Sequence, residues 1–410
     1  MKATAISALL ALMLAIAQVQ ADVRINQIQF VGSHNSYKQA MSRFYRAVLG
    51  LIDADAAKSL DYEHVPLQDQ LELGLRKLEL DVFYQPRSLT FPVGHVQVID
   101  MNSHCLTLRA CLIEIVQWSD ANPQHSPIWI SFNAKDQQID WLPAPTLFDA
   151  QAFSTMDDVL EEVVGSRLIR PAAVKAWGAS LPNWPTLDEA RGKFLMILDE
   201  GGAKRETYLN DWRQRPMFTS VGIEHPAAAV MIVNDPIKDF GRIQKLVRRG
   251  FMVRTRADAN TVEARANDVK RLQAAFASGA QAISTDYYMP INPFGNNYRI
   301  WLASGERCNP VSAPPQCSTS SASSPLSSSD DPLLFRGPPS ISWVMGGLKH
   351  FIWYARKQPA RSHSRTSLSS VHSILRQMEH PTSSTSTPAS SPSSRSAGRR
   401  PRGVPAQGRG

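Results

Sequence analysis

The chain places a histidine and an asparagine side by side where an apolar segment ends. Residues 25–31 form an apolar run broken by polar residues, Gly32 and Ser33 follow, and His34 and Asn35 come next. We expect a strand to give way to a loop here, and barrel enzymes carry their catalytic groups at such strand ends. An imidazole and an amide at one point can supply a proton acceptor and a neutral oxygen ligand. The alternative is a buried histidine with a structural role.

Two carboxylates share one face of a second predicted strand, residues 77–83. Because side chains alternate along a strand, Leu78, Leu80 and Val82 occupy one face while Glu79 and Asp81 occupy the other. In a barrel the apolar face packs against helices, so the carboxylates point into the interior. Two buried acids without partners cost several kcal/mol, and a hard cation would neutralise them. Oxygen donors favour Ca²⁺, or alternatively Mg²⁺, over zinc. An ion-paired or surface-facing pair is the other interpretation.

Two further segments bring groups of the same kind. His95 lies in a third predicted strand, residues 93–98, and Asn133 and Lys135 share a face at the end of a fourth. Two histidines beside a metal site allow one to accept a proton while the other donates one, as cleavage of a phosphate ester by an internal nucleophile requires. Asn133 offers an amide ligand, and Lys135 offers a cation suited to a phosphate oxygen.

Strands alternate with helical patterns from residue 22 to about residue 300, which indicates a parallel sheet built of βα units. Eight strands, mostly one per helix, favour a (β/α)₈ TIM barrel over an open sheet. No glycine-rich nucleotide-binding pattern follows any of them. The predicted strands are 25–31, 77–83, 93–98, 128–132, 194–198, 229–233, 251–255 and 281–285, and the helical patterns are 107–120, 155–164, 240–249 and 262–277.

The N-terminus and the cysteines predict export. Residues 1–21 combine Lys2, an uncharged apolar run and small residues near Ala21, which is typical of a signal peptide. The run is shorter than the roughly 20 residues of a spanning helix. The four cysteines form two close pairs, Cys105 with Cys111 and Cys308 with Cys317, and we expect two local disulfides. We expect a secreted, extracellular protein, with the periplasm as the alternative location.

The positive charge of the chain belongs to its C-terminal tail. Residues 318–410 hold twelve Lys or Arg against three Asp or Glu, a net +9, which leaves −1 for the remainder. A nucleic-acid partner is therefore not expected for the body of the chain. The tail is rich in Ser, Pro and Arg, and such a composition predicts disorder. The island at 341–357 mixes aromatic and basic residues; it is either a helix at a membrane interface or part of an unstructured tail.

These segments resemble, in order and spacing, the secreted calcium-dependent phosphatidylinositol-specific phospholipase C family, a group of PLC-like phosphodiesterases on a TIM barrel. The resemblance covers about residues 22–317, which we take as one barrel domain, and excludes the tail. It is carried by His34-Asn35, Glu79-Leu80-Asp81, His95 and Asn133-Ala134-Lys135, and by the segments 253–258, 283–287 and 307–311.

The resemblance implies a role for each matched residue. His34 is the general base on the inositol 2-hydroxyl, and His95 is the general acid toward the diacylglycerol oxygen. Asn35, Glu79 and Asp81 hold Ca²⁺, which neutralises charge on the phosphoryl oxygens. The products are diacylglycerol and a cyclic or open inositol phosphate. The implied partners are a phospholipid and, transiently, a membrane surface, and we expect a monomer.

One departure and three further groups complete the predicted site. Asn133 stands where calcium-dependent relatives usually have a glutamate, so we expect weakened calcium binding. Lys135 is the best phosphate contact. Arg254 and Arg256 share a face and either reach the phosphate or an inositol hydroxyl, or pair with Asp258 or Asp286. Asp286 ends the eighth strand, where it either holds the His34 imidazole in one tautomer or caps a turn.

Other functions remain open from the sequence. Glycerophosphodiester phosphodiesterases and sphingomyelinase-D-like lyases use a related barrel with paired histidines and an acidic metal site, and a shared fold does not decide the substrate. A lipid-binding barrel whose active site has decayed is the non-enzymatic alternative, and Asn133 is the residue that favours it.

Overall fold

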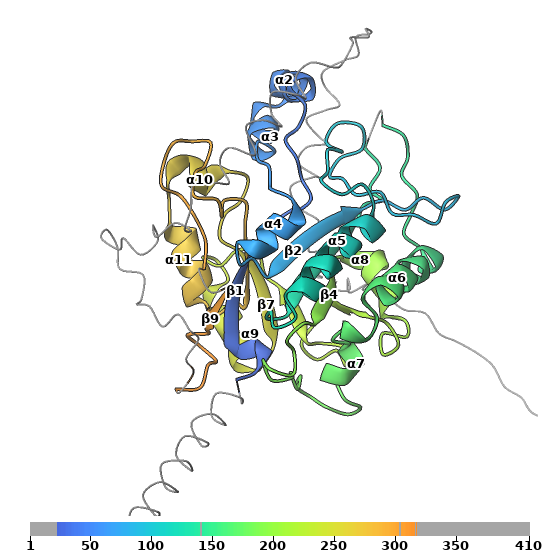
Figure 1. Ribbon diagram of the computed structural model, residues 1–410, viewed down its shortest axis with the longest axis vertical. Coiled ribbons are helices and arrows are strands. Elements are labelled where there is room, and N and C mark those ends of the chain that lie inside the picture. Colours follow the sequence, from blue (N-terminus) through green and yellow to red (C-terminus); the bar gives the residue numbers. More distant parts are fainter. Residues whose placement is uncertain (1–22, 140–141, 303–304, 316, 318–410) are drawn as a thin grey trace, which may run out of the picture.

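The computed structural model describes residues 23–139, 142–302, 305–315 and 317. The predicted signal peptide, the predicted disordered tail and the island at 341–357 lie outside the described residues. Figure 1 shows the described part as a sheet surrounded by helices, with the pair α2 and α3 standing apart at one end.

Eight parallel strands form a nearly closed barrel. Their order is β5-β4-β3-β2-β1-β8-β7-β6, and a single bridge between Ser220 and Val230 joins the two ends of this row. A ninth strand pairs antiparallel with β1. The predicted TIM barrel is therefore confirmed. The strands are β1 (Ile28–Ser33), β2 (Lys77–Val82), β3 (Ile128–Ala134), β4 (Phe194–Leu198), β5 (Met217–Thr219), β6 (Val230–Ile232), β7 (Met252–Arg256), β8 (Ala282–Thr285) and β9 (Glu306–Cys308).

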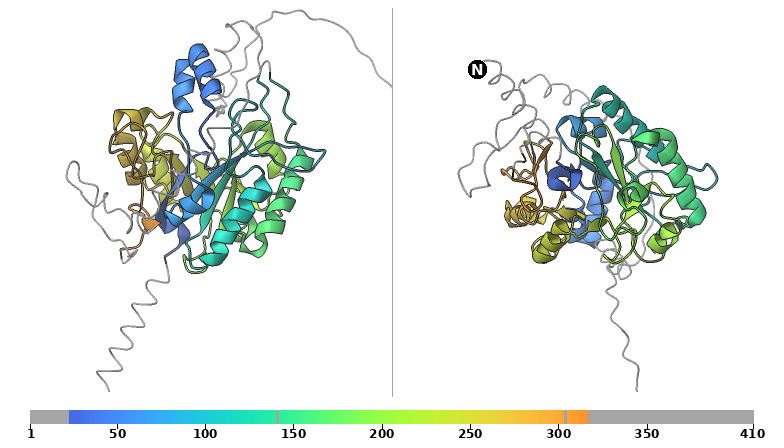
Figure 2. Two further views of the ribbon diagram at one scale, coloured as in Figure 1. Left: turned by 45° about the horizontal axis from the view of Figure 1, so that its top comes forward. Right: turned by 90° about the horizontal axis from the view of Figure 1, so that it is seen from below.

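Helices cover the outer face of the barrel, with α5 and α6 on one side and α9 and α11 on another (Figures 1 and 2). None of the described helices has both the length and the apolar character needed to cross a membrane. The helices are η1 (Ile25–Gln27), α2 (Arg43–Ile52), α3 (Ala54–Ser59), α4 (Leu67–Glu72), α5 (Leu108–Ala121), α6 (Ala150–Val164), η2 (Gly165–Arg167), α7 (Pro171–Val174), α8 (Gly202–Leu209), α9 (Phe240–Arg248), α10 (Val262–Ala266) and α11 (Lys270–Ala277).

Strand β2 shows how the alternating pattern builds the barrel. Leu78, Leu80 and Val82 are fully buried in the core between the sheet and the helices, together with Leu112 and Ile115 of α5. The residues between them face the barrel interior and are buried as well. The apolar face thus orients the strand, and the polar face is left to line the inside of the barrel.

Three details of the predicted elements are wrong. Residues 93–98 do not form a strand: Val96 pairs back onto Asp100, and Val98 has a positive φ of 67°, so the segment turns instead of extending. The eighth barrel strand is β5, whose three residues are too few to show a period of two in the sequence. The predicted helix at 262–277 is split into α10 and α11, because Asn267 adopts a left-handed conformation with φ of 51°.

Both predicted disulfides are present, Cys105–Cys111 and Cys308–Cys317. The first closes the long excursion between β2 and α5, and the second closes the segment after β9. Each joins residues near in sequence and so holds one loop in place.

The close approach of β1 and β2 at Gly32 can be tested by substitution. Gly32 is paired with Lys77, and a Cβ atom at Gly32 would lie 2.0 Å from the Lys77 carbonyl oxygen. We expect Gly32→Ala to lower the free energy of unfolding by about 3 kcal/mol, since backbone must move. The control is Gly241→Ala in α9, where an added Cβ atom would meet no neighbouring atom within 4 Å. This substitution should leave the free energy of unfolding unchanged or slightly raised. Urea denaturation measures both, and equal stabilities would contradict the close approach.

Candidate active site

The carboxyl ends of the barrel strands surround a cavity of about 230 Å³. Its wall is built by the ends of β1, β2, β3 and β7, by α3 and by segments that follow other strands. Every side chain that the sequence singles out lines this cavity: His34, Asn35, Glu79, Asp81, His95, Asn133, Lys135, Arg254, Arg256 and Asp286. Groups spread along the chain are thus brought to one end of the barrel.

His34 follows β1, and two neighbours hold its Nδ1 atom. Asp286 follows β8, the parallel neighbour of β1, and its Oδ1 lies 3.2 Å from His34 Nδ1. The hydroxyl of Tyr62 lies 3.3 Å from the same nitrogen and accepts a hydrogen bond from Asn35 Nδ2 at 2.8 Å. A carboxylate beside Nδ1 favours the tautomer with the proton on that nitrogen. Nε2 is then the nitrogen that can accept a proton.

The surroundings of His34 lower the pKa of its imidazole below the usual 6.5. Burial is the largest cause, and the Arg256 guanidinium adds to it. The carboxylates of Asp286 and Glu79 act in the opposite direction without cancelling the effect. His34 is therefore neutral at neutral pH, which is the state that a general base needs.

Glu79 is buried in the barrel interior and bound by two cations. Lys77 Nζ contacts Glu79 Oε2, and Arg254 Nη2 donates to the same oxygen at 2.8 Å. Burial would raise the pKa of the Glu79 carboxyl, but Lys77 and Arg254 hold it well below its usual range. The expectation of acids without partners is therefore wrong. Alternation along β2 puts Lys77 on the same interior face as Glu79, and Arg254 reaches it from β7.

Asp81 is bound by two residues at the end of β3. The strands β2 and β3 pair with Asp81 opposite Asn133. Asn133 Nδ2 donates to Asp81 Oδ1 at 2.9 Å and to Glu79 Oε1 at 3.2 Å. Lys135 Nζ lies 3.1 Å from Asp81 Oδ2. The amide nitrogen of Asn133 thus joins the two carboxylates, and Lys135 adds a positive charge beside them.

His95 is carried by a turn and not by the strand that the sequence predicts. Its Nδ1 lies 3.2 Å from Asp100 Oδ2, and its backbone N–H donates to the Asp100 carbonyl at 2.9 Å. Lys38 Nζ binds both oxygens of the Asp100 carboxylate, at 2.7 and 2.9 Å, and is itself fully buried. His95 therefore has a carboxylate behind its ring, as His34 does, and that carboxylate has a cation of its own.

The two arginines of β7 have different partners. Arg254 donates to Glu79 and to Asn234, so the predicted pairing with Asp258 or Asp286 is not found for it. Arg256 does have that pairing: its Nη2 lies 3.8 Å from Asp286 Oδ2, and its Nε donates to the Asp258 carbonyl at 3.1 Å. Arg254 is thus committed to the carboxylate cluster, while Arg256 stands beside His34.

Four functional residues were missed by the sequence reasoning. Lys77 had a signal, since it shares the interior face of β2 with the two acids. Lys38, Tyr62 and Asp100 had none, because each reaches its partner through a loop whose path only the folded chain defines: Tyr62 meets His34, Asp100 meets His95, and Lys38 meets Asp100. A further acid, Glu200, follows β4 and lines the cavity; burial raises its pKa to about 7 despite Lys204 at 2.7 Å.

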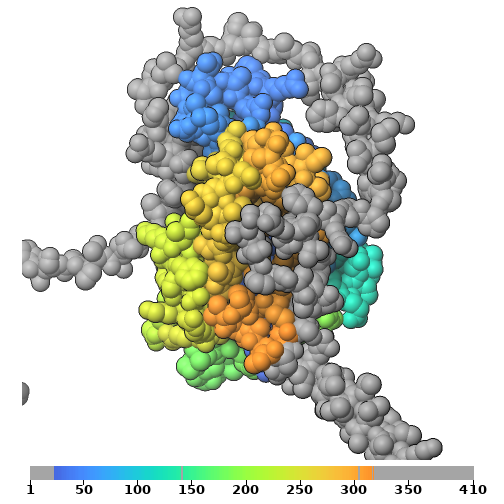
Figure 3. Space-filling model, turned by 90° about the vertical axis from the view of Figure 1, so that its left-hand side faces the viewer, coloured from blue at the N-terminus to red at the C-terminus, as the bar shows by residue number. Residues whose placement is uncertain are grey.

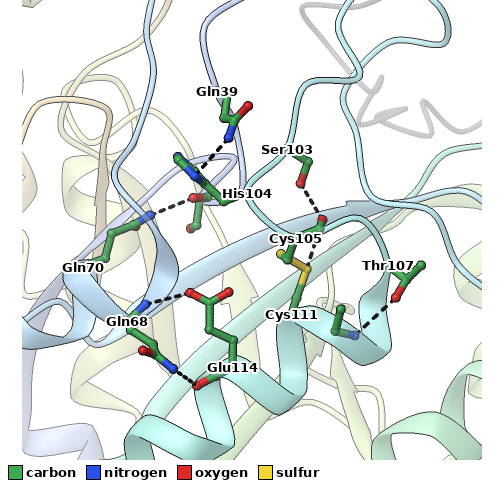
Figure 4. Close-up of a disulfide and its surroundings, with 11 residues drawn as sticks. Gln39, Gln68, Gln70, Ser103, His104, Cys105, Thr107, Cys111 and Glu114 are labelled. Carbon is green, nitrogen blue, oxygen red and sulfur yellow. Dashed lines mark hydrogen bonds between the residues drawn. A yellow bond between two sulfur atoms is a disulfide. The ribbon is translucent and has the colours of Figure 1, made fainter. Parts of the chain in front are cut away.

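A disulfide holds the excursion that carries His95 to the start of α5. Figure 4 shows Cys105 joined to Cys111, with the Ser103 hydroxyl donating to the Cys105 carbonyl at 2.6 Å. Nearby, the Thr107 hydroxyl accepts the N–H of Ala110 and caps α5. The crosslink and the cap both lie where the excursion meets α5, so the excursion returns to the barrel at a defined place.

The donor set of the predicted metal site is made of oxygen atoms. The amides of Asn35 and Asn133 and the carboxylates of Glu79 and Asp81 line one cavity, and their chemistry fits a hard cation. Three cations already face the two carboxylates, and the Asn133 amide presents its nitrogen to both. Within the described residues no three His, Cys, Asp or Glu side chains group as a metal site. The donor atoms therefore have the chemistry of a hard-cation site, but in this arrangement Lys77, Lys135, Arg254 and the Asn133 amide nitrogen occupy the carboxylate oxygens that Ca²⁺ would need.

Two imidazoles line the cavity, and each lies against a carboxylate. Cations lie beside them at the mouth of the parallel barrel. This combination of groups is typical of a barrel enzyme that cleaves phosphate esters. The family model described as Ca²⁺-dependent phosphoinositide phospholipase C matches residues 23–92 and 88–310. The chain belongs to this family, whose members are phosphoric diester hydrolases. The resemblance noted in the sequence is confirmed. No curated protein is significantly similar in sequence.

Several solved structures are similar to this chain. A calcium-dependent phosphoinositol-specific phospholipase C from Pseudomonas sp. is 17% identical, with 70% of this chain and 96% of that chain covered and a TM-score of 0.46. A Ca²⁺-dependent phosphatidylinositol-specific phospholipase C from Streptomyces antibioticus is 17% identical, with 64% and 95% covered and a TM-score of 0.45. PLC21 from L. pealei is 12% identical, with 71% and 38% covered and a TM-score of 0.40.

Opposite shifts of the His34 pKa test the electrostatics of the site. Asp286→Asn removes a charge that raises this pKa, so the pKa falls and the imidazole stays neutral to lower pH. Arg256→Gln removes a charge that lowers it, so the pKa rises and the base is lost at higher pH. NMR titration of the His34 ring measures the pKa in both variants, and the His34→Gln variant identifies which signal belongs to His34. The acidic limb of the pH–rate profile should move in the same direction as this pKa. Shifts in the same direction would contradict the arrangement.

Proposed function

We propose that this protein cleaves phosphatidylinositol into diacylglycerol and an inositol phosphate by way of a cyclic phosphate. The proposal is supported above all by the two imidazoles on one cavity, each with a carboxylate at its Nδ1 atom. This pairing leaves an Nε2 atom on each ring for the substrate, one to accept a proton and one to donate it. Membership of the family supports the substrate class.

The two histidines divide the proton transfers of the first step. His34 takes the proton of the inositol 2-hydroxyl as its oxygen attacks phosphorus, and a cyclic phosphodiester forms. The bond between phosphorus and the glycerol oxygen breaks, and His95 gives that oxygen its proton, which releases diacylglycerol. In the second step His95 takes a proton from water, the ring opens, and His34 returns its proton to the 2-hydroxyl, so both histidines end as they began.

We assign some cations of the cavity a structural role and others a role in binding the substrate. Arg254 is buried and bound to Glu79, so we assign it to the carboxylate cluster instead of the phosphate. Lys135 and Arg256 are partly exposed at the cavity wall, with side chains 30% and 16% exposed. We assign these two to the phosphate oxygens, where their charge offsets that of the pentacoordinate transition state.

We assign Ca²⁺, which the family description names, to the oxygens of Asn35, Glu79, Asp81 and Asn133. When bound, the ion would supply positive charge to the phosphoryl oxygens. Asn133 has to turn its amide so that its oxygen faces the ion, and Lys135 competes for Asp81. Both features predict weak binding, and the same oxygens could hold Mg²⁺ in place of Ca²⁺.

We also propose that the protein is exported and acts as a monomer at a lipid surface. The two disulfides support export, because such crosslinks persist in oxidising compartments. Action at a lipid surface is supported by membership of the phosphoinositide phospholipase C family.

Removal of either histidine tests the proposed chemistry. We expect His34→Ala and His95→Ala each to lower kcat on short-chain phosphatidylinositol by roughly 10²–10⁴-fold, the range for loss of a general acid or base. The control is His225→Ala, a histidine between β5 and β6 that does not line the cavity, which should retain full activity. Phosphorus NMR follows the cyclic and open products.

The same assay separates the alternatives. Release of choline phosphate from sphingomyelin or of glycerol phosphate from glycerophosphodiesters, without inositol phosphate from phosphatidylinositol, would replace the proposed substrate. If His34→Ala equals the wild type on every substrate and binds lipid as well, the protein is a lipid-binding barrel instead of an enzyme.

Calcium titration tests the charge balance of the cation site. Asn133→Glu adds a charged ligand and Lys135→Met removes a competing cation, so we expect each to tighten Ca²⁺ binding at least tenfold, about 1.4 kcal/mol. Lys58→Met on α3, which neutralises an exposed lysine, should leave the affinity unchanged. Isothermal calorimetry without lipid measures this directly. Equal affinities of the wild type and Asn133→Glu would show that the assigned site is wrong.

A further inference from the structure

Lys38 is a buried lysine to which the proposed reaction gives no step. Its side chain is 1% exposed and does not line the cavity. Its Nζ binds both oxygens of the Asp100 carboxylate, at 2.7 and 2.9 Å, and lies 5.3 Å from the centroid of the Tyr62 ring. A buried ion pair adds little net stability compared with apolar side chains of similar size. The geometry that this lysine fixes is therefore the better explanation of its presence.

Asp100 links this lysine to the ring of the candidate acid. Its Oδ2 lies 3.2 Å from His95 Nδ1, and its backbone carbonyl accepts the His95 N–H at 2.9 Å. Burial would raise the pKa of the Asp100 carboxyl, but the His95 ring and Lys38 hold it below its usual value. The ammonium group, the carboxylate and the imidazole thus form one chain of contacts.

The backbone of Lys38 belongs to the turn that carries the candidate base. The turn begins at His34 after β1, and the Lys38 N–H donates to the Asn35 carbonyl at 2.9 Å. The chain then runs out through α2 and α3, in blue at the top of Figure 3, and comes back at His64. The N–H of His64 donates to the Lys38 carbonyl at 2.9 Å. Backbone hydrogen bonds therefore fix Lys38 relative to the base.

The excursion that carries the candidate acid lies alongside this turn. Lys38 and Ser103 form an antiparallel bridge, and the Gln39 N–H donates to the Asn102 carbonyl at 3.1 Å. The amide of Gln39 also lies 3.2 Å from His104 Nδ1 (Figure 4). These contacts hold the end of the excursion, whereas the lysine side chain reaches the turn on which the acid lies.

Other groups hold the candidate base. His34 Nδ1 lies 3.2 Å from Asp286 Oδ1, and the His34 carbonyl accepts a hydrogen bond from His64 Nε2 at 2.6 Å. Neither contact passes through Asp100. Loss of the Lys38 charge should therefore change the acid and spare the base.

We infer that Lys38 is the positioning residue of the general acid, because it holds the Asp100 carboxylate behind the His95 ring and so directs Nε2 to the leaving oxygen. The inference rests on the proposed function, in which His95 protonates that oxygen. Without the ammonium group, the buried Asp100 carboxylate has lost its cation, so it takes up a proton or turns toward solvent. The ring then loses its support.

The test is Lys38→Met in the full chain, assayed on two soluble inositol phosphodiesters that differ only in their leaving group. Methionine keeps an apolar side chain against the Tyr62 ring and removes the charge. On the alkyl ester kcat should fall roughly 10–100-fold, part of the 10²–10⁴-fold that a general acid supplies. On the nitrophenyl ester it should stay within about threefold, because a nitrophenolate leaves without a proton. Asp286→Asn, which acts on the base, should lower both rates alike.

A second buried lysine provides the matched control. Lys175 is 2% exposed, donates its Nζ to the carbonyls of Ala179 and Ser180 at 2.8 and 3.0 Å, and does not line the cavity. Lys175→Met should keep the wild-type rate on both esters.

A double variant guards against a failure to fold. Lys38→Met combined with Asp100→Asn removes both charges and strands neither of them. Its loss of kcat on the alkyl ester should equal the loss in Asp100→Asn alone, because two residues that act as a unit do not give additive effects.

A spectroscopic measurement reports on the ring without any turnover. The proton on His95 Nδ1, which is hydrogen-bonded to a carboxylate, should give a downfield proton NMR signal that His95→Gln abolishes. The signal should disappear or move upfield in Lys38→Met and stay in place in Lys175→Met. This readout is decided even if the proposed reaction is wrong.

Several results would overturn the inference. These are equal losses on the two esters or a wild-type rate on the alkyl ester in Lys38→Met, the same selective loss in Lys175→Met, and additive losses from Lys38→Met and Asp100→Asn. A His95 signal that is absent from the wild type or unchanged in Lys38→Met would do the same. A wild type that cleaves neither ester while the signal responds as expected would instead defeat the proposed function and leave Lys38 as the residue that holds His95.

Discussion

The buried ion cluster of Lys77, Glu79 and Arg254 is the interaction on which the site depends. Lys77 and Arg254 enter the barrel interior from β2 and β7 and meet on one carboxylate oxygen. Removing one member of such a buried group strands a charge and costs about 3–5 kcal/mol. The cluster therefore joins two strands across the interior, and it keeps Glu79 ionised beside His34. Gly32 makes it possible, because only a residue without a Cβ leaves room for the Lys77 backbone at that point of β1.

The two candidate catalytic histidines, His34 and His95, have similar partners but different charged surroundings. Each imidazole meets a carboxylate through Nδ1, and each carboxylate meets a cation, Arg256 for Asp286 and Lys38 for Asp100. Lys38 binds Asp100 closely through both carboxylate oxygens, while Arg256 is 3.8 Å from Asp286. Different surroundings of two similar groups are how a protein separates an acid from a base. The assignment of His34 as base agrees with the lowered pKa of its ring.

The cavity, the oxygen donors proposed for Ca²⁺ and α2 lie at one end of the barrel. The interior of the cavity is polar and rich in charge, α3 forms part of its wall, and the neighbouring α2 exposes Phe44, Val48 and Leu51.

The sequence alone determined the barrel, most of its strands and ten of the side chains that line the cavity. It could do so because a period of two sorts Leu78 from Glu79 without reference to any partner, and because strand ends such as Gly32-Ser33-His34 carry their own turn signals. Local patterns also predicted the two disulfides, since each joins cysteines close in the chain.

Only the tertiary structure decided how the charges are paired. Glu79 looked unpaired because its second cation, Arg254, comes from a strand far along the chain, and Asp100 was missed because it reaches His95 through a turn that resembles a strand in sequence. The exposure of Phe44, Val48 and Leu51 on α2 was likewise hidden, since apolar residues give the same pattern whether they are buried or exposed. Electrostatic pairing and exposure depend on distances between elements, and no local pattern encodes those distances.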